Sequence, residues 1–236
     1  MKRLGLSILL SLIALVVAGG IWISVSWQDV AAEPDFWEDE IIAFEAADAI
    51  APPEKGLVLF TGSSSIRFWT SLTEDMEPLR VLNRGFGGAH MSHVVHNADR
   101  IIKPYAPRAL VVYVGDNDIG SGKTPEVVEA DFRQLLAKVR ETLPEIPVYY
   151  LTIKASRLRW DLWPEMQKAN ERIRVIAAAD PLVRILDVSS PMVELGAGEA
   201  PPPELFRFDG LHLSEEGYAL WTEIVRPRLL AELGAG

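Results

Sequence analysis

The sequence contains no cysteine among its 236 residues. Disulfide bonds, cysteine nucleophiles and cysteine-ligated zinc are therefore excluded, although the compartment stays open because exported proteins need not carry disulfides. Basic residues are also in the minority, since 23 Lys and Arg oppose 33 Asp and Glu and give a formal net charge of −10. Nucleic-acid binding requires a concentrated positive surface, so we expect no nucleic-acid partner.

Residues 1–28 are interpreted as an N-terminal membrane anchor or signal segment. Positions 4–25 carry no charged residue and follow Lys2 and Arg3, and their length is that of a transmembrane helix. The basic flank predicts that the globular part lies on the non-cytoplasmic side, in the cell envelope. Because the apolar run exceeds the usual core of a signal peptide, we favour an uncleaved hydrophobic helix over an exported, cleaved form.

Residues 29–54 predict an acidic connector with an amphipathic helix, whose apolar stripe would consist of Trp37, Ile41, Ile42 and Phe44. Residues 55–236 predict a single domain in which apolar strands alternate with amphipathic helices. The expected strands are 57–60, 80–83, 110–114, 148–153 and 183–188, and the expected helices are 65–72, 91–102, 124–143, 163–179 and 214–233. This alternation predicts a three-layer α/β/α domain around a central parallel sheet of about five strands.

One apolar strand, residues 57–60, leads through Gly62 into three consecutive serines. A run that is apolar at every position is typical of a strand buried on both faces. Open α/β sheets hold their ligands at the carboxyl ends of such strands, where a helix N-terminus also offers free N–H groups. Ser63, Ser64 and Ser65 are therefore candidate nucleophiles, provided that a base reaches one of them.

The candidate base is His212, which lies in the sequence FDGLHLS. Asp209 precedes it by three residues, so its carboxylate can orient the imidazole ring from within the same turn. The alternative is a helix-capping turn, because Asp and Ser also favour helix N-termini.

Two further segments follow predicted strands. The sequence NRGFGG at 83–88 predicts a loop that presents backbone N–H groups, and it lacks the spacing of a nucleotide-binding motif. Asn117, in GDND at 115–118, is either a turn residue or a neutral amide that donates to an oxyanion.

A metal-dependent phosphoester hydrolase is a further alternative. It would use Asp116 and Asp118 together with His90, His93 and His96. Three histidines spaced in this way fan around a helix and cannot all reach one ion. We therefore expect a solvated helix face and no bound metal.

The segments GSSS, NRGFGG, GDND and DGLH together resemble, in order and approximate spacing, the motif blocks of the SGNH hydrolases, also called the GDSL esterase/lipase superfamily. The resemblance runs from about Gly56 to the C-terminus and implies a flavodoxin-like fold and a serine esterase without a cofactor. The implied roles are nucleophile for Ser64, oxyanion donors for Ser64, Gly88 and Asn117, general base for His212 and its orienting acid for Asp209. Most members have an acid where Ser63 stands, so Ser63 and Ser65 remain alternative nucleophiles.

The resemblance also implies a small-molecule ester substrate with an acetyl, other small acyl or lysophospholipid-like group. Trp160, Trp163 and Arg157, with Arg159 as the alternative cation, lie in KASRLRWDLW after a predicted strand and are candidate substrate-binding residues. Alternatively, the two tryptophans attach the following helix to the core. A catalytically silent, membrane-anchored binding module is the alternative function, although no motif residue is missing. The sequence leaves the oligomeric state open.

Overall fold

The computed structural model describes residues 33–234, which begin with a short helical turn, η1 (Pro34–Trp37). From Trp37 onward the described residues form one compact unit. The predicted N-terminal helix, residues 1–28, lies outside the described residues. Between residues 33 and 234 no helix combines the length and the apolar character that crossing a bilayer requires.

Five parallel strands form a single sheet in the order β2-β1-β3-β4-β5. The strands are β1 (Val58–Gly62), β2 (Val81–Gly85), β3 (Ala109–Tyr113), β4 (Val148–Leu151) and β5 (Val183–Leu186). The predicted parallel sheet of about five strands is thus confirmed. Because the chain steps outward from β1 to β2 and then returns to β3 on the other side, the carboxyl ends of β1 and β3 form the switch point where such sheets bind ligands.

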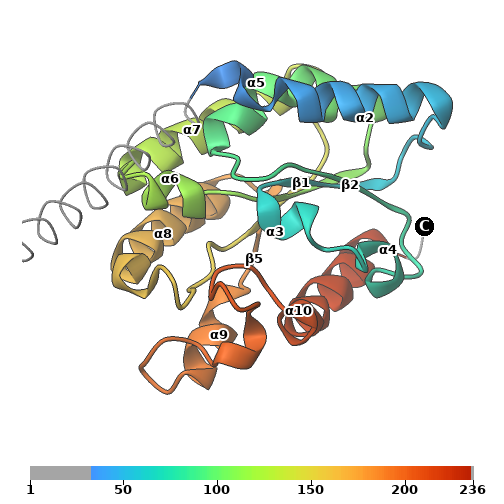
Figure 1. Ribbon diagram of the computed structural model, residues 1–236. Helices are drawn as coiled ribbons and strands as arrows, with labels where there is room; N and C mark the ends of the chain where they lie inside the picture. The colour runs from blue at the N-terminus through green and yellow to red at the C-terminus, as the bar shows by residue number, and fades with distance from the viewer. Residues whose placement is uncertain (1–32, 235–236) are drawn as a thin grey trace, which may run out of the picture. The chain divides into compact units, whose positions relative to one another are not determined.

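Helices cover both faces of this sheet, as Figure 1 shows. One face carries α2 (Glu38–Ile50), α5 (Met91–Ile101), α7 (Pro125–Arg140) and α8 (Trp163–Ala179), and the other carries α3 (Ser64–Arg67), α4 (Leu72–Asp75), α9 (Ser189–Leu195) and α10 (Glu215–Leu233). The short helix α6 (Asp116–Gly120) follows β3. This arrangement is what right-handed crossovers produce when the strand order reverses after β2.

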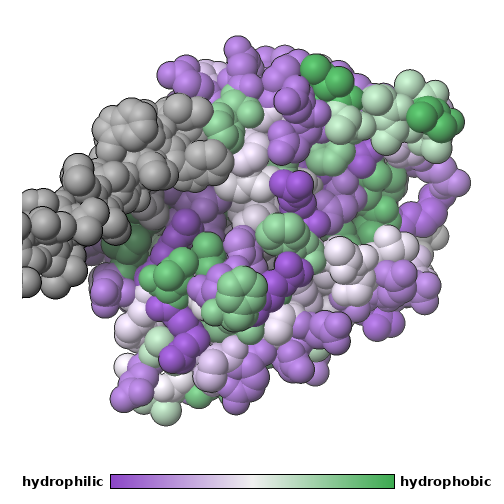
Figure 2. Space-filling model, viewed as in Figure 1, coloured by the Kyte–Doolittle hydropathy of each residue, from purple (hydrophilic) through white to green (hydrophobic). Residues whose placement is uncertain are grey.

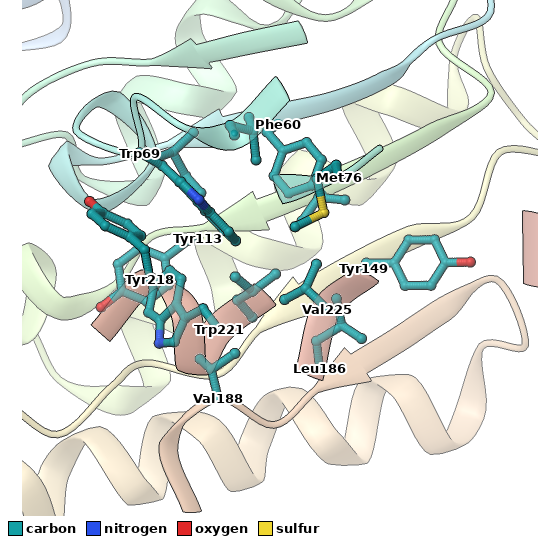
Figure 3. Close-up of a cluster of buried hydrophobic side chains, with 14 of the residues drawn as sticks. Phe60, Trp69, Met76, Tyr113, Tyr149, Leu186, Val188, Tyr218, Trp221 and Val225 are labelled. Atoms are coloured by element: carbon teal, nitrogen blue, oxygen red, sulfur yellow. The ribbon is translucent and has the colours of Figure 1, made fainter. Parts of the chain in front are cut away.

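The core between the sheet and α10 is rich in aromatic rings (Figure 3). Trp221 of α10 is fully buried. Its ring centroid lies 5.8 Å from that of Trp69, 4.9 Å from that of Tyr113 and 6.3 Å from that of Tyr218. Trp221 therefore connects the last helix both to β3 and to the segment that follows β1.

Three local predictions differ from the structure. The single helix expected at 65–72 is two short helices, α3 and α4, because the intervening Phe, Trp, Thr and Ser have low helix propensity. Residues 116–120, expected as a turn, form α6, and α9 was not predicted.

Helix α2 belongs to the compact unit, but its buried stripe is narrower than predicted. Trp37 and Ile41 are buried, whereas Ile42 is 48% exposed. Trp37 and Ile41 are four positions apart and share a helix face, while Ile42 is rotated from that face by about 100°. In Figure 2, hydrophilic residues are spread over the visible face, and hydrophobic residues lie over α2 and also around α3 and α8.

Truncation of Trp221 tests the importance of the aromatic core. Replacing it with alanine removes a fully buried ring and leaves a cavity, so Trp221→Ala should lower the free energy of unfolding by about 3–5 kcal/mol. Urea denaturation followed by circular dichroism measures this change. The matched control is Val175→Ala on α8, where Val175 is 65% exposed, and this variant should stay within about 0.5 kcal/mol of the parent.

Candidate active site

Ser64 is the first residue of α3, directly after the turn that ends β1. Gly62 makes this turn possible, because its φ is +132° and a Cβ atom there would lie only 1.9 Å from the carbonyl oxygen of Tyr113. The N–H of Ser63 donates to the same carbonyl at 2.9 Å. The serine segment is therefore fixed against β3, and Ser64 is 7% exposed at the carboxyl edge of the sheet.

The structure brings Ser64, His212 and Asp209 together in one chain of hydrogen bonds. Ser64 Oγ lies 3.0 Å from His212 Nε2, and His212 Nδ1 lies 2.6 Å from Asp209 Oδ2. The hydroxyls of Ser63 and Ser65 are buried and have no hydrogen-bond partner among the residues that the structure describes. Of the three consecutive serines, Ser64 is thus the one whose hydroxyl reaches the imidazole.

Asp209 determines which nitrogen of His212 carries the proton. Its Oδ1 accepts the N–H groups of Leu211 and His212, both at 2.9 Å. Burial acts to raise the pKa of Asp209, but the hydrogen bonds from the His212 ring and from these two N–H groups outweigh burial and lower it to about 2. The carboxylate is then only an acceptor, so Nδ1 carries the hydrogen and Nε2 is free to accept the Ser64 proton.

The turn that carries His212 is attached to its neighbours on both sides. An antiparallel bridge between Phe206 and Leu213 closes the segment into a small hairpin. At its tip, the carbonyl of Gly210 accepts the N–H of Leu158 at 3.0 Å. The ring of Phe68 meets the His212 ring edge-on, with centroids 4.9 Å apart. These contacts restrict the imidazole to the side that faces Ser64.

The segments that follow β2 and β3 flank Ser64, because β2 and β3 lie on either side of β1. Gly88 lies in the loop after β2 with φ of +70°, and a Cβ atom there would be 2.9 Å from the ring of Trp37. Asn117 lies in α6, directly after β3, and its Nδ2 donates to the carbonyl of Ala89 at 3.1 Å. The two segments predicted to supply oxyanion donors are therefore joined directly to each other.

The acid before Asn117 is engaged by two cations. Asp116 Oδ2 lies 3.2 Å from Lys154 Nζ and 3.5 Å from Arg159 Nη1. Burial acts to raise the pKa of Asp116, but the two cations outweigh burial and keep the pKa below its ordinary value. Lys154 is 1% exposed, and burial lowers the pKa of its ammonium. Lys154 was not predicted as part of the site; its only signal is a charged residue soon after an apolar strand.

The acid after Asn117 is engaged as well. Asp118 is fully buried and accepts hydrogen bonds from Lys123 Nζ at 2.8 Å and from the N–H of Met91 at 3.0 Å. Neither aspartate of the GDND segment is thus available as a free ligand. Within residues 33–234, no cluster of three or more His, Asp or Glu side chains is arranged to hold a metal ion.

The prediction of a solvated histidine face is wrong for two of the three residues. His93 is fully buried and His90 is 4% exposed, because α5 packs against both α2 and α7. The Nδ1 atom of His93 accepts the N–H of His90 at 2.9 Å and so closes the first turn of α5. Burial and the neighbouring charge of Lys123 lower the pKa of His90 to about 4.

The three predicted substrate-binding residues differ in their exposure and contacts. Trp163 is 8% exposed at the start of α8, and Trp160 stacks on it with an interplanar angle of 8° and centroids 6.5 Å apart. This arrangement matches the alternative interpretation, in which the tryptophans attach α8 to the core. Arg157 is exposed and donates to the carbonyl of Pro201 at 3.0 Å.

A cavity of about 490 Å³ that was not anticipated from the sequence is lined by residues that follow α3 and by residues at the start of α10. Phe68, which touches His212, and Arg207 line it. The guanidinium carbon of Arg207 lies 4.8 Å from the centroid of the Phe68 ring.

Comparison by sequence links the chain to one family. The sequence profile of the GDSL-like lipase/acylhydrolase family matches residues 54–220, which contain all four motif segments. No curated protein matches the chain by sequence.

Solved structures with a similar fold extend this result. A Streptococcus pneumoniae protein described as a candidate platelet activating factor has a TM-score of 0.74 at 19% identity, with 90% of this chain and 99% of that chain covered. A GDSL-like lipase from Bacteroides thetaiotaomicron has a TM-score of 0.71 at 18% identity, with coverage of 82% and 98%. A variant of an acetyl-xylooligosaccharide esterase from Geobacillus has a TM-score of 0.58 at 15% identity, with coverage of 77% and 95%. At these identities the likeness shows a shared fold.

The lowered pKa of His90 predicts a specific loss of stability in acid. Its folded-state value of about 4 lies below the ordinary 6.5, so the native state favours the neutral ring. The neutral His90 ring makes its full contribution to the free energy of unfolding above about pH 6.5. This contribution is lost as the pH falls from 6.5 through 4, and about 2 kcal/mol of it is lost at pH 5. His90→Gln cannot gain this charge, so its free energy of unfolding should fall less than that of the parent between about pH 7.5 and pH 5. Equal falls in urea denaturation would contradict the assignment.

Proposed function

Because this chain belongs to the GDSL-like lipase/acylhydrolase family and is a carboxylic ester hydrolase, we propose that Ser64 is its nucleophile, His212 its general base and Asp209 the residue that orients His212. One observation carries the proposal. The hydroxyl of Ser64 and the carboxylate of Asp209 lie at hydrogen-bond distance from opposite nitrogens of the same imidazole, at 3.0 Å and 2.6 Å.

The reaction is acyl transfer to water. His212 Nε2 takes the proton of Ser64 as Oγ adds to the ester carbonyl, and the imidazolium is stabilised by ionised Asp209. His212 then gives this proton to the departing alcohol, which leaves an acyl ester on Ser64. A water molecule, deprotonated by the same nitrogen, releases the acid and regenerates the serine.

The negative charge that develops on the carbonyl oxygen needs donors that are already in place. We assign this role to the N–H groups of Ser64 and Gly88 and to the side-chain amide of Asn117. The direct hydrogen bond from Asn117 to Ala89 supports this assignment, because it fixes two of the donor segments relative to each other. Donors held in this way stabilise the transition state without having to reorganise.

The proposed substrates are esters with an acetyl, another small acyl or a lysophospholipid-like group. Phe68, whose ring contacts His212, also lines the cavity of about 490 Å³, and we assign this cavity to a bulky portion of the substrate. A panel of esters that varies the acyl chain and the alcohol separately will define which portion this cavity receives.

Substitution of the nucleophile is the first test of the mechanism. Ser64→Ala removes the attacking oxygen and should lower kcat/KM for p-nitrophenyl acetate by at least about 10³-fold. It should also abolish labelling by a fluorophosphonate probe, which bonds covalently to an activated serine. The binding-module alternative predicts that the parent protein is not labelled at all.

Ser63→Ala and Ser65→Ala are the matched controls for this experiment. Each removes the buried hydroxyl of a serine next to Ser64 in the sequence, and neither hydroxyl has a hydrogen-bond partner within residues 33–234. Both variants should keep probe labelling and remain within about tenfold of the parent activity. If Ser64→Ala kept full activity, Ser64 would not be the nucleophile. If only one of the two control variants lost activity, the serine replaced in that control would be the nucleophile. Activity that chelators abolish would instead favour the metal-dependent alternative.

The proposed location is the cell envelope, with residues 1–28 as the membrane attachment. This proposal rests on the uncharged run at positions 4–25 and its basic flank. The full chain should sediment with membranes and resist extraction by alkaline carbonate, whereas a chain that begins at Glu33 should remain in the supernatant. Release of the full chain by carbonate would contradict an uncleaved anchor.

A further inference from the structure

Arg159 lies between β4 and α8 in the sequence but makes its polar contacts with α6, the short helix after β3. Its Nη1 donates to the carbonyl of Asp116 at 2.9 Å, and its Nη2 donates to Oδ1 of Asn117 at 3.1 Å. The same guanidinium lies 3.5 Å from the carboxylate of Asp116. Arg159 is therefore directed at Asn117 and its neighbour, and its fork is occupied by groups of the protein.

These contacts determine how the Asn117 amide is oriented. Its oxygen faces the Arg159 guanidinium, and its nitrogen faces the carbonyl of Ala89 at 3.1 Å. The reversed amide would point its NH₂ group at a cation and its oxygen at another oxygen, so both neighbours disfavour it. An amide nitrogen carries two hydrogens, and Ala89 uses one. The second remains available for a substrate oxyanion.

The position of Arg159 is itself built into the fold. A Cβ atom on Gly120 would lie 2.8 Å from Cζ of Arg159, so the guanidinium occupies space that only glycine leaves open at that position. On the other side, Lys154 holds the Asp116 carboxylate that attracts Arg159. The guanidinium is thus held in place by the space beside Gly120 and by the buried carboxylate of Asp116.

We propose that Arg159 is a positioning residue for the hydrolytic reaction, which fixes the Asn117 amide with one N–H directed at the oxyanion and strengthens that N–H as a donor. The inference rests on the proposed function of Asn117. Arginine is suited to this task because its planar fork binds two acceptors at once and stays protonated. Withdrawal of electron density from the amide oxygen by a cation makes the amide N–H a better donor to a negative oxygen.

Steady-state kinetics on purified full-length variants test this role. Arg159→Met should lower kcat for p-nitrophenyl acetate by about 10- to 100-fold with KM within about threefold, because the lost interaction acts in the transition state. Arg159→Lys keeps the charge but loses the fork, and its kcat should lie between those of the parent and Arg159→Met. Gly120→Ala should displace the guanidinium and lower kcat in the same direction while Arg159 itself is retained.

A double-mutant cycle distinguishes positioning from a general structural effect. Once Asn117→Ala has removed the amide, Arg159 has nothing left to orient, so adding Arg159→Met should lower kcat by less than about threefold more. Millimolar guanidinium should partly restore the activity of Arg159→Ala and should not restore Asn117→Ala. Thermal unfolding of each variant verifies that it is folded, and Arg133→Met on the exposed face of α7 is the control for loss of an arginine.

Two results would overturn the inference. Equal loss of kcat from Arg159→Met in the parent and in Asn117→Ala would show that the two residues act independently. A raised KM with unchanged kcat would show that Arg159 binds substrate. These results are distinguishable from failure of the proposed function. If the proposed function fails, Ser64→Ala remains active. If only the inference about Arg159 fails, Ser64→Ala and Asn117→Ala are still impaired.

Discussion

The close approach of Gly62 to the carbonyl of Tyr113 is the constraint on which the site depends. No other residue type fits there, since any Cβ would overlap with that carbonyl. Because of this tight turn, α3 begins directly after β1, and Ser64 lies at the switch point between β1 and β3. The loops after β2 and β3 then reach the serine from both sides without long excursions. A parallel sheet with this strand order therefore brings the proposed catalytic groups together, and it requires glycine at position 62.

The charged groups of the site divide into a local pair and an assembled cluster. Asp209 and His212 share a single hairpin, so their contact needs only that hairpin to form. Asp116, Lys154 and Arg159 come from two strand ends and meet only in the finished fold. A buried ion pair of this second kind contributes little net stability, because desolvation offsets the attraction. Its effect is conformational, because it determines the position of α6 and therefore of the Asn117 amide.

The structural features that could be predicted from the sequence are those that depend on periodicity or on contacts within a few residues. The bounds of α8 were predicted to the residue, and the five-stranded sheet followed from the alternation of elements. The Asp209–His212 pair is likewise local. The position of Arg159 beside Asn117 was not predicted, because its partners lie 42 and 43 residues away in the sequence. His90 and His93 were misjudged for the same reason, since the helices that bury them come from distant parts of the chain.

The distance between Ser64 and His212 is set by core packing more than by the residues around it. The two side chains are separated by 148 positions and belong to the first and last parts of the domain. Tyr218 of α10 donates to the carbonyl of Ser65 at 2.9 Å and stacks on Trp69, so the final helix is tied to the segment that carries the nucleophile. Any loosening of α10 would move the imidazole relative to the serine hydroxyl, and the hydrogen bond between them tolerates only a few tenths of an ångström. The geometry of the proposed site and the aromatic core therefore depend on the same packing of α10 against the sheet.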